Sequence, residues 1–428
     1  MTGDLRTKTP VGVVGLGYVG LPLALAMTEA GYDIVGVDVS DEKVQQLEDG
    51  RSYVSDVSDE DVATALDAGF TPTTEYSALE AVEGVSLCVP TPLRKSGQPD
   101  ISYVMDAAER LSEVLTPGST VVLESTVYPG ATEEVVAETL ADNRMVVGED
   151  IFVSFSPERI DPGNEEYGIT DIPKVIGGVT TECGDHAEAL YDPVFDTLVR
   201  VDSSTEAELS KLLENTFRGI NIGLVNELAM IADSLDADIW NVIDAAATKP
   251  FGFIPFYPGP GLGGHCIPVD PQYLSWKAKQ QGIETRFIDL ADRINRDMPS
   301  YVVSRVIDLL NRNGIASVDA SVLVLGAAYK ADVSDTRESP ALDVISLLGE
   351  RDVAVGYHDP YVDEVTIGEQ TYTSRELTDE TLASYDCVVI ATNHSDYDID
   401  RICESASLLF DARNATADHA HLEHVHRL

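Results

Sequence analysis

The fold is decided by a short stretch near the N-terminus, Val11-Gly12-Val13-Val14-Gly15-Leu16-Gly17-Tyr18-Val19-Gly20. Its first four residues have the pattern of a short buried strand, and the remainder fits G-x-G-x-x-G. An apolar stretch with helical character follows over 21–30, and a second strand is predicted over 34–39. Because the glycines permit a tight turn and let a pyrophosphate approach the helix N-terminus, the stretch predicts a dinucleotide-binding unit.

The acidic residue that closes the second predicted strand indicates which dinucleotide binds. Asp38 can accept hydrogen bonds from both ribose hydroxyls, and its charge would repel a 2′-phosphate. The sequence therefore predicts NAD rather than NADP, held by Gly15, Gly17, Gly20 and Asp38. A glycine-rich turn without a ligand is the alternative, which the surrounding strand, helix and carboxylate disfavour.

Strand and helix signals alternate along most of the remaining chain. Further strands are predicted over 84–89, 120–124 and 151–154, and again over 321–325, 353–357, 386–391 and 408–411. Between these groups, apolar residues recur at spacings of three and four from 206 to 240, which predicts a long helix, and more helix is expected over 271–313. The predicted fold class is α/β, with two Rossmann-like doubly wound domains (1–204 and 314–428) joined by a helical middle domain (205–313).

Composition narrows the functional class. Of the 428 residues, 28 are Lys or Arg and 74 are Asp or Glu, which gives a net charge of −46. So acidic a surface repels nucleic acid and anionic lipid, so neither is an expected partner. With no apolar run of about 18 residues, no signal peptide pattern and five scattered cysteines, the chain is expected to be cytoplasmic. Adaptation to high salt is the hypothesis for the excess of acid.

The most informative loop surrounds a cysteine, Tyr257-Pro258-Gly259-Pro260-Gly261-Leu262-Gly263-Gly264-His265-Cys266-Ile267-Pro268-Val269-Asp270. Its four glycines and three prolines fit a backbone that approaches a ligand closely. Beside a nicotinamide cofactor, the Cys266 thiolate could add to an aldehyde, and loss of a hydride would then give a thioester that water cleaves. The alternative is that Cys266 is a buried structural cysteine. A metal site is not expected, because no other Cys or His lies at ligand spacing from Cys266.

Three polar residues share one face of the long predicted helix. Lys211, Asn215 and Arg218 are spaced at i, i+4 and i+7 and could bind an anionic ligand and stabilise an oxyanion. Their spacing equally allows a surface salt-bridge ladder through Glu214. The spacing alone leaves both interpretations open.

Two other motifs suggest competing functions. Tyr273 and Lys277 fit the Tyr-x-x-x-Lys pair of short-chain dehydrogenases and nucleotide-sugar epimerases. The terminal histidines 419, 421, 424 and 426 could bind a metal, although such tails are more often solvated, and no metal is expected. A non-catalytic nucleotide-sugar binding protein would lack the thiol or the lysine, and both are present.

Taken in order, these motifs resemble the UDP-glucose/GDP-mannose dehydrogenase family from Val11 to Asn414. The matching segments are Gly15–Gly20, Val89–Pro92, Glu124–Gly130, Ser156–Arg159, Lys211–Arg218, Gly261–Asp270 and Tyr329–Pro340. The resemblance implies a four-electron oxidation of a sugar C6 alcohol to a carboxylate, with two NAD and one water. It also implies a UDP-sugar substrate, a homodimer or higher homo-oligomer, and a role in polysaccharide biosynthesis.

The resemblance implies roles for individual residues. Cys266 is the nucleophile, Lys211 and Asn215 stabilise the alkoxide and oxyanion, and Glu158, Thr126 and Asp270 order or activate water. The implied substrate residues are Arg159, Ile160, Lys211, Asn215, Arg218, Tyr257, Gly263, Tyr329 and Lys330. The implied NAD residues are Gly15, Gly17, Tyr18, Val19, Gly20, Asp38, Lys43, Thr91, Thr126 and Arg337.

Two stretches resemble the subgroup that acts on UDP-N-acetylglucosamine, namely Ala247–Gly261 and Ser156–Asn164. UDP-glucose enzymes usually differ in both stretches. UDP-N-acetylmannosamine enzymes carry a histidine and an arginine near the place of Phe251 and Phe253. UDP-N-acetylglucosamine is therefore the expected substrate, with the mannosamine epimer and UDP-glucose as alternatives.

Overall fold

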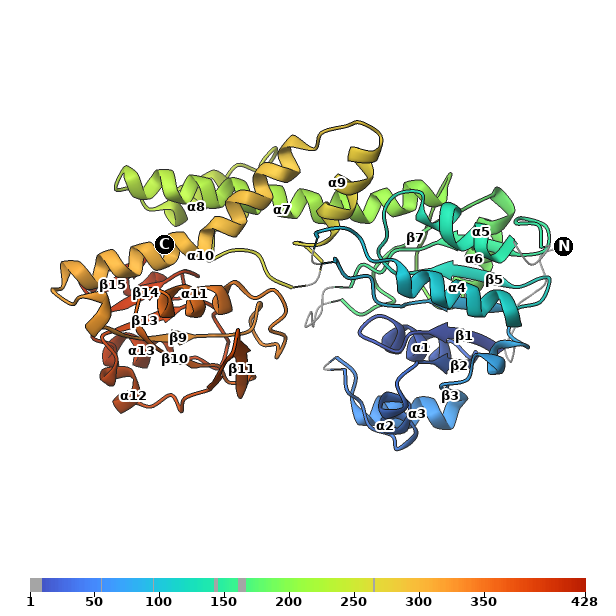
Figure 1. The fold of residues 1–428 in the computed structure, drawn as a ribbon, viewed down its shortest axis with the longest axis horizontal. Helices are drawn as coiled ribbons and strands as arrows, with labels where there is room; N and C mark the ends of the chain where they lie inside the picture. Colours follow the sequence, from blue (N-terminus) through green and yellow to red (C-terminus); the bar gives the residue numbers. More distant parts are fainter. Residues whose placement is uncertain (1–9, 55, 95, 142–144, 161–166, 265) are drawn as a thin grey trace. The chain divides into compact units, whose positions relative to one another are not determined.

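A computed structural model of the chain describes residues 10–54, 56–94, 96–141, 145–160, 167–264 and 266–428. The chain divides into two compact units (Figure 1). The first unit comprises Met1–Glu214 and Gln272–Ile283, and the second comprises Asn215–Pro271 and Glu284–Leu428.

The first unit contains an eight-stranded sheet of order β3-β2-β1-β4-β5-β6-β7-β8. Its neighbouring strands are parallel except for β6 and β7, which pair antiparallel. The order of the first six strands is that of a Rossmann sheet, so the doubly wound fold predicted here is confirmed. The strands are β1 Pro10–Val14, β2 Asp33–Val37, β3 Phe70–Thr73, β4 Gly84–Leu87, β5 Thr120–Leu123, β6 Phe152–Phe155, β7 Lys174–Gly178 and β8 Leu198–Val201.

Helices flank this sheet and bury its apolar strands. Val11 and Val13 of β1 and Ile34 of β2 are fully buried against Leu21 and Leu23 of α1. Removing such surfaces from water stabilises the fold by about 25 cal/mol per Å² of apolar area. The helical segments are α1 Gly20–Glu29, α2 Asp41–Glu48, α3 Asp59–Ala68, η1 Tyr76–Leu79, α4 Ser102–Val114, the π-helical η2 Thr132–Ala137, α5 Glu138–Ala141 and α6 Thr181–Tyr191.

The second unit contains a parallel five-stranded sheet of order β10-β9-β13-β14-β15 and a β11–β12 hairpin. The strands are β9 Ser321–Leu325, β10 Ala354–His358, β11 Glu364–Ile367, β12 Gln370–Thr373, β13 Cys387–Ile390, β14 Leu409–Asp411 and β15 Val425–Arg427. Its helical segments are α8 Ile239–Ala247, α10 Arg286–Arg312, η3 Ser317–Asp319, α11 Pro340–Gly349, α12 Asp379–Ser384, α13 Ile399–Ser405 and η4 Ala417–His419.

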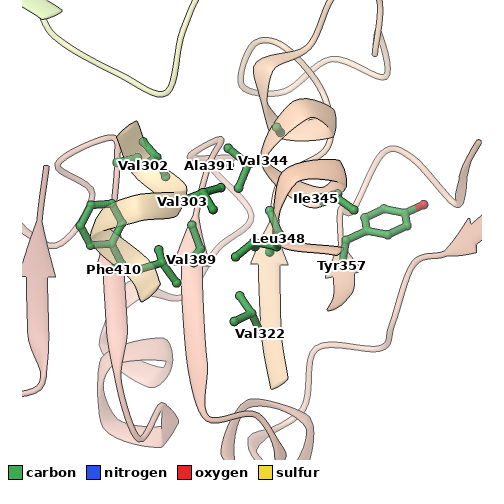
Figure 2. Close-up of a cluster of buried hydrophobic side chains, with 14 of the residues drawn as sticks. Val302, Val303, Val322, Val344, Ile345, Leu348, Tyr357, Val389, Ala391 and Phe410 are labelled. Carbon is green, nitrogen blue, oxygen red and sulfur yellow. The ribbon is translucent and has the colours of Figure 1, made fainter. Parts of the chain in front are cut away.

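Figure 2 shows how this second core is filled. Val302 and Val303 of α10 lie near Val389 of β13 and Phe410 of β14, while α11 packs Leu348 over Val322 of β9. All of these side chains are almost completely buried. The adjacent strands β9 and β13 are almost entirely apolar, as expected where helices cover both faces of a parallel sheet.

Two helices, α7 Ser204–Ser234 and α9 Asp270–Gln280, run from one unit into the other. The helix predicted over 206–240 ends at Ser234 because Asp236 adopts a positive φ of 52°, and the Asp238 side chain then caps α8. The helix expected over 271–313 is interrupted near Gly282, whose φ is +73°. The predicted domain boundaries fall at the start of α7 and the end of α10, and the three-domain division itself stays a prediction.

Candidate active site

The glycine loop between β1 and α1 excludes side chains at two positions. A Cβ atom on Gly20 would lie 1.8 Å from the Gly15 carbonyl oxygen, and one on Gly15 would lie 2.5 Å from that of Cys88. Gly15 also has a φ of +89°, which favours glycine. A Cβ on Gly17 would meet no atom within 4 Å, so packing within the chain does not require this glycine. Gly17 is the glycine that the fingerprint assigns to close approach of a pyrophosphate.

Asp38 follows β2 and is fixed by the same loop. Its Oδ2 accepts a hydrogen bond of 3.0 Å from the Leu16 amide, and its Oδ1 accepts one of 3.0 Å from Ser40. Lys43 Nζ lies 3.3 Å from Oδ2. Tyr53, which the sequence analysis did not select, donates a 2.6 Å hydrogen bond to the Leu16 carbonyl. The loop and the carboxylate are therefore held by hydrogen bonds within the chain.

The loops after β4 and β5 lie at the same carboxyl edge of the sheet and are bonded together. Ser125 donates through its hydroxyl to the Val89 carbonyl at 2.7 Å. Thr91 is buried, and its carbonyl accepts a 3.0 Å hydrogen bond from the buried Tyr273 hydroxyl of α9. Thr126 lies beside Ser125 and is half-buried. In this strand order the edge beside β1 and β4 is the crevice where open α/β sheets bind ligands.

Glu158 follows β6 and is almost completely buried. Its Oε1 accepts hydrogen bonds from the Arg159 and Ile160 amides at 2.6 and 2.7 Å, and its Oε2 lies 3.3 Å from Lys174 Nζ. Burial opposes ionisation of this carboxyl, but Lys174, these amides and Lys211 outweigh it and hold the pKa of Glu158 below its ordinary value. Glu158 is therefore an ionised, fixed hydrogen-bond acceptor.

Lys211 on α7 is buried, and its Nζ donates to the Glu158 backbone carbonyl at 2.8 Å. Glu214 instead pairs with the Arg159 guanidinium, at 2.6 and 3.1 Å. The salt-bridge ladder that the helical spacing also allowed is therefore not formed between Lys211 and Glu214. The ammonium of Lys211 is held toward Glu158.

In the second unit, Asn215 and Asp270 are bonded to each other. Asn215 Nδ2 donates to Asp270 Oδ2 at 2.6 Å, and the Asp270 carboxyl is almost completely buried. The Asp270 and Val269 amides both donate to the Cys266 carbonyl, at 2.8 and 3.2 Å. Asp270 thus connects the two others: its amide is bonded to the Cys266 carbonyl and its carboxylate to the Asn215 side chain.

Cys266 is exposed, whereas the other four cysteines of the chain are buried. Burial raises the pKa of Cys387 to about 12 and that of Cys403 to about 11, and it raises the pKa of Cys88 well above its ordinary value. Thiols in such surroundings stay protonated and unreactive. Cys266 is thus the accessible thiol, and its predicted neighbour His265 lies outside the described residues.

The loop that leads to Cys266 packs against a second predicted motif. A Cβ on Gly263 would lie 2.6 Å from Tyr329 Cβ, and the Gly264 amide donates to the Arg337 carbonyl at 3.0 Å. Buried Asn226 accepts from the Gly259 amide at 3.0 Å, which anchors the start of the loop on α7. The structure therefore brings Gly263, Tyr329 and Arg337 together, and the close approach explains the glycines.

The remaining predicted residues lie nearer the surface. Tyr18, Arg218, Tyr257 and Arg337 are exposed, and Val19, Ile160 and Lys330 are half-buried. Tyr257 stacks on Trp240, and Arg337 pairs with Asp335 at 2.6 Å. Residues 161–164 of the predicted subgroup motif lie outside the described residues.

The competing Tyr-x-x-x-Lys motif has a different role. Tyr273 is bonded to the Thr91 carbonyl, as described above, whereas Lys277 Nζ pairs with Glu134 at 2.6 and 2.8 Å. Tyr273 thus attaches α9 to the loop after β4, and Lys277 attaches it to η2. These contacts differ from the shared Tyr–Lys pair that an epimerase would need, so they disfavour that alternative.

The C-terminal sheet carries a buried pair that sequence reasoning missed. His394 Nε2 lies 3.1 Å from Asp359 Oδ2, and both side chains are fully buried. Asp359 also accepts from the Ala327 and Ala328 amides at 2.7 and 3.0 Å, as Asp38 does from Leu16 in the first unit. The signal in the sequence was Asp359 itself, an acidic residue directly after β10, as Asp38 is after β2.

The terminal histidines have other contacts. His424 Nε2 lies 2.8 Å from the Cys403 carbonyl, and His419 Nε2 lies 3.0 Å from Asp400. Within the part of the chain that the structure describes, no group of three or more His, Cys, Asp or Glu residues could hold a metal ion. Over the same residues, no helix combines the length and apolar character needed to cross a bilayer.

Three family models match consecutive parts of the chain. Residues 9–195, 205–297 and 323–418 match the NAD binding domain, the central domain and the UDP binding domain of the UDP-glucose/GDP-mannose dehydrogenase family. A UDP-N-acetyl-D-glucosamine 6-dehydrogenase from Salmonella typhi is 34% identical over 91% of both chains. A UDP-N-acetyl-D-mannosamine dehydrogenase from Methanococcus maripaludis is also 34% identical, over 96% of this chain and 94% of its own.

Among solved structures, a UDP-D-ManNAc dehydrogenase from Pyrococcus horikoshii has a TM-score of 0.89 at 31% identity, covering 98% of this chain and 99% of its own. The three consecutive family matches, the two relatives and this structural likeness all agree. The chain belongs to the UDP-glucose/GDP-mannose dehydrogenase family.

Proposed function

We propose that the protein is an NAD-dependent UDP-N-acetylhexosamine 6-dehydrogenase that oxidises the C6 hydroxyl of its substrate to a carboxylate. The single observation that carries this proposal is the exposed Cys266 thiol, whose backbone carbonyl accepts from the amide of Asp270, the residue whose carboxylate accepts from Asn215. An accessible thiol beside fixed polar groups suits formation and hydrolysis of a thioester. Relatives that are named for two UDP-N-acetylhexosamines support the substrate class.

The residues present fit NAD. Gly17 leaves room for a pyrophosphate, and the buried carboxylate of Asp38 lies at the place where a ribose is recognised. We assign Gly15, Gly17, Tyr18, Val19, Gly20, Asp38, Lys43, Thr91, Thr126 and Arg337 to this cofactor. NAD supplies the acceptor for each of the two hydrides.

The chain supplies the groups that move protons and hold charge. In the first oxidation the C6 alcohol loses a proton and a hydride, and Lys211 stabilises the alkoxide. The Cys266 sulfur then bonds to the aldehyde carbon, and Asn215 and Lys211 stabilise the oxyanion of the thiohemiacetal. Loss of a second hydride leaves a thioester.

Hydrolysis of the thioester releases the acid. Water adds to the thioester carbon, the carbon–sulfur bond breaks, and Cys266 regains its thiol. Glu158 and Asp270, both fixed by hydrogen bonds, accept the proton of that water or orient it, together with Thr126. The overall reaction consumes one water and two NAD for each sugar.

We further propose which residues bind the nucleotide-sugar. The proposed contacts are Arg159, Ile160, Lys211, Asn215, Arg218, Tyr257, Gly263, Tyr329 and Lys330. Cations are scarce in a chain of net charge −46, so Arg159, Arg218 and Lys330 would provide the charge that a diphosphate needs.

UDP-N-acetylglucosamine is the preferred substrate, and its mannosamine epimer is the second candidate. The stretch 247–261 favours the glucosamine, whereas the structural likeness to the Pyrococcus horikoshii protein favours the mannosamine. Epimers differ at one carbon, so one hydrogen bond can decide between them.

A substrate panel tests the proposal. UDP-glucose, UDP-N-acetylglucosamine, UDP-N-acetylgalactosamine and UDP-N-acetylmannosamine are each mixed with NAD or NADP, and reduced cofactor is counted per sugar consumed. The expected result is two NADH per N-acetylglucosamine sugar and little activity with NADP. One NADH per sugar, or none with any N-acetyl sugar, would overturn the proposed reaction or the substrate class.

The protein is further proposed to be a homodimer, cytoplasmic and adapted to salt. Leu224, Leu228 and Ile231 of α7, with Leu235 directly after the helix, are exposed at helical spacing, and monomers rarely leave such an apolar stripe in water. A second copy of this chain is the proposed occupant. Sedimentation analysis of Leu228→Glu tests it: the variant is expected to become monomeric, and an unchanged dimer would contradict this surface.

A further inference from the structure

A buried lysine links two carboxylates at the edge of the first sheet. Lys174 begins β7, a strand that is otherwise apolar, and its side chain is only 4% exposed. Its Nζ lies 2.6 Å from Glu124 Oε2, which follows β5, and 3.3 Å from Glu158 Oε2, which follows β6. The ammonium also lies 3.4 Å from the Pro157 carbonyl. None of these contacts was anticipated from the sequence, and the proposed reaction gives Lys174 no role.

The far side of Glu124 is also occupied. Tyr191 of α6 donates to Glu124 Oε1, and the Tyr191 hydroxyl lies 2.9 Å from Ser86 Oγ of β4. Lys174 lies 5.2 Å from the centroid of the Phe195 ring, which adds a cation–π contact. A continuous chain of polar groups therefore runs from Ser86 in the sheet to Glu158.

The positive charge of Lys174 favours the ionised form of Glu158. Lys174 from β7 and Lys211 from α7 are the cations that face the carboxylate, and Glu124 is the anion nearby. The Tyr191 hydroxyl and the Cys88 thiol complete the titratable surroundings, and burial keeps both protonated by raising their pKa. Burial disfavours the charge of Lys174, yet the two carboxylates raise its pKa above its ordinary value.

The orientation of Glu158 depends on the same contacts. With Oε1 bonded to two amides and Oε2 directed to Lys174, the carboxylate cannot rotate without leaving a buried charge unpaired. The carbonyl of Glu158 in turn accepts from Lys211, so a movement of this residue would also move the proposed oxyanion-stabilising ammonium.

We propose that Lys174 is a positioning residue for the dehydrogenase reaction, which keeps Glu158 ionised and correctly oriented without touching the substrate. Glu124 and Tyr191 act with it by fixing the ammonium from the opposite side. The proposal rests on the proposed function, because it requires that Glu158 handle water during thioester hydrolysis.

The test compares the pH dependence of kcat in four proteins: wild type, Lys174→Met, Lys174→Arg and Glu158→Gln. Loss of the nearest cation raises the pKa of Glu158, so the acid limb of the Lys174→Met profile is expected to move to higher pH by about one unit or more. At neutral pH kcat should fall at least about tenfold, with KM for NAD changed less than about threefold. Lys174→Arg keeps the charge and should restore the wild-type limb.

A second variant serves as the control for loss of folding. Lys174→Met leaves two buried carboxylates unpaired, so Lys174→Met/Glu124→Gln, which removes one of them, keeps the measurement possible if the single variant unfolds. The acid limb of the double variant is expected to move to higher pH, as in Lys174→Met, but by a smaller amount. A purely structural lysine would lower the melting temperature and leave the acid limb in place, and that result would overturn the inference.

The Glu158→Gln protein separates the two proposals. If it retains the kcat and pH profile of the wild type, Glu158 has no part in the reaction and the proposed function needs revision. If it loses activity while the Lys174→Met limb stays where it is in the wild type, only the role of Lys174 is wrong.

Discussion

Asn215 donates a 2.6 Å hydrogen bond to Asp270, and so joins the long helix α7 to the first residue of α9, four residues after Cys266. The bond is made by a neutral donor to a buried carboxylate, so it orients Asp270 without neutralising it. Asp270 also donates its amide to the Cys266 carbonyl. The pair therefore supports the backbone at Cys266, the proposed nucleophile.

Replacement of Asp270 by Asn tests this support. The variant keeps the size of the side chain but loses the charge, so kcat is expected to fall about 100-fold, while KM for the UDP-sugar changes little. Steady-state kinetics beside a thermal melt give both quantities. An Asp270→Asn protein with wild-type kcat would show that the carboxylate takes no part in the chemistry.

The glycine loop gives a matched pair of variants. Gly20→Ala places a methyl group 1.8 Å from the Gly15 carbonyl oxygen and is expected to destabilise the protein by at least about 3 kcal/mol. Gly17→Ala meets no atom within 4 Å, so its melting temperature should match that of the wild type while KM for NAD rises at least about tenfold. Equal NAD affinity in Gly17→Ala and wild type would argue against a pyrophosphate at this position.

Glu208 on α7 is predicted to make stability depend on pH. Its buried carboxyl accepts from the Thr132 amide and hydroxyl at 2.8 and 2.7 Å, and burial raises its pKa to about 7. Since the folded pKa lies above the unfolded one, the protonated form contributes stability at low pH that is lost as pH rises through 7. Relative to Glu208→Gln, the wild type should lose roughly 3 kcal/mol between pH 5 and 8.

The measurement is the free energy of unfolding of both proteins across that range. Glu208→Gln stays neutral, and its amide oxygen can accept the two hydrogen bonds from Thr132. It loses the bond that Oε2 accepts from the Gly130 amide, a cost that does not depend on pH, so the difference in pH dependence between the two proteins reports the titration. Parallel curves for the two proteins would mean that Glu208 ionises freely in the folded state.

Salt is expected to stabilise the protein because the net charge of −46 repels itself at low ionic strength. Melting temperatures in dilute buffer and in molar KCl measure the effect, with sucrose as a control for solvent exclusion. The melting temperature should rise in KCl by several degrees more than in sucrose. A melting temperature that does not change with KCl would contradict salt adaptation as the reason for the acidic surface.

Local patterns allowed much of this architecture to be predicted. The strand, glycine loop and helix over residues 11–30 lie within one short segment, so the residues that determine them are neighbours in sequence. The spacing of Lys211 and Asn215 likewise placed them one helical turn apart. The predicted strands of the second sheet also correspond to β9, β10, β13 and β14 within a few residues.

Contacts between distant segments could not be predicted. Lys174 meets Glu124 and Glu158 across 50 and 16 residues, and no local pattern specifies such a pairing. Helical spacing suggested Lys211 as a salt-bridge partner for Glu214. In the folded chain Glu214 instead pairs with Arg159, which is 55 residues away in the sequence. The short β7 and β8, the strand β15 and the buried pair of Asp359 and His394 were missed for the same reason.

The proposed reaction requires that Cys266 carry the sugar as a thioester before water releases the acid. Glu158→Gln should slow that release, so acid-quenched protein mixed with NAD and UDP-N-acetylglucosamine is examined by mass spectrometry of the peptide that contains Cys266. A mass increase equal to the acyl group of the oxidised sugar nucleotide is expected on that cysteine, and it should be absent in Cys266→Ser. Turnover to the carboxylate with Cys266 unmodified at every quench time, or full activity of Cys266→Ser, would contradict it.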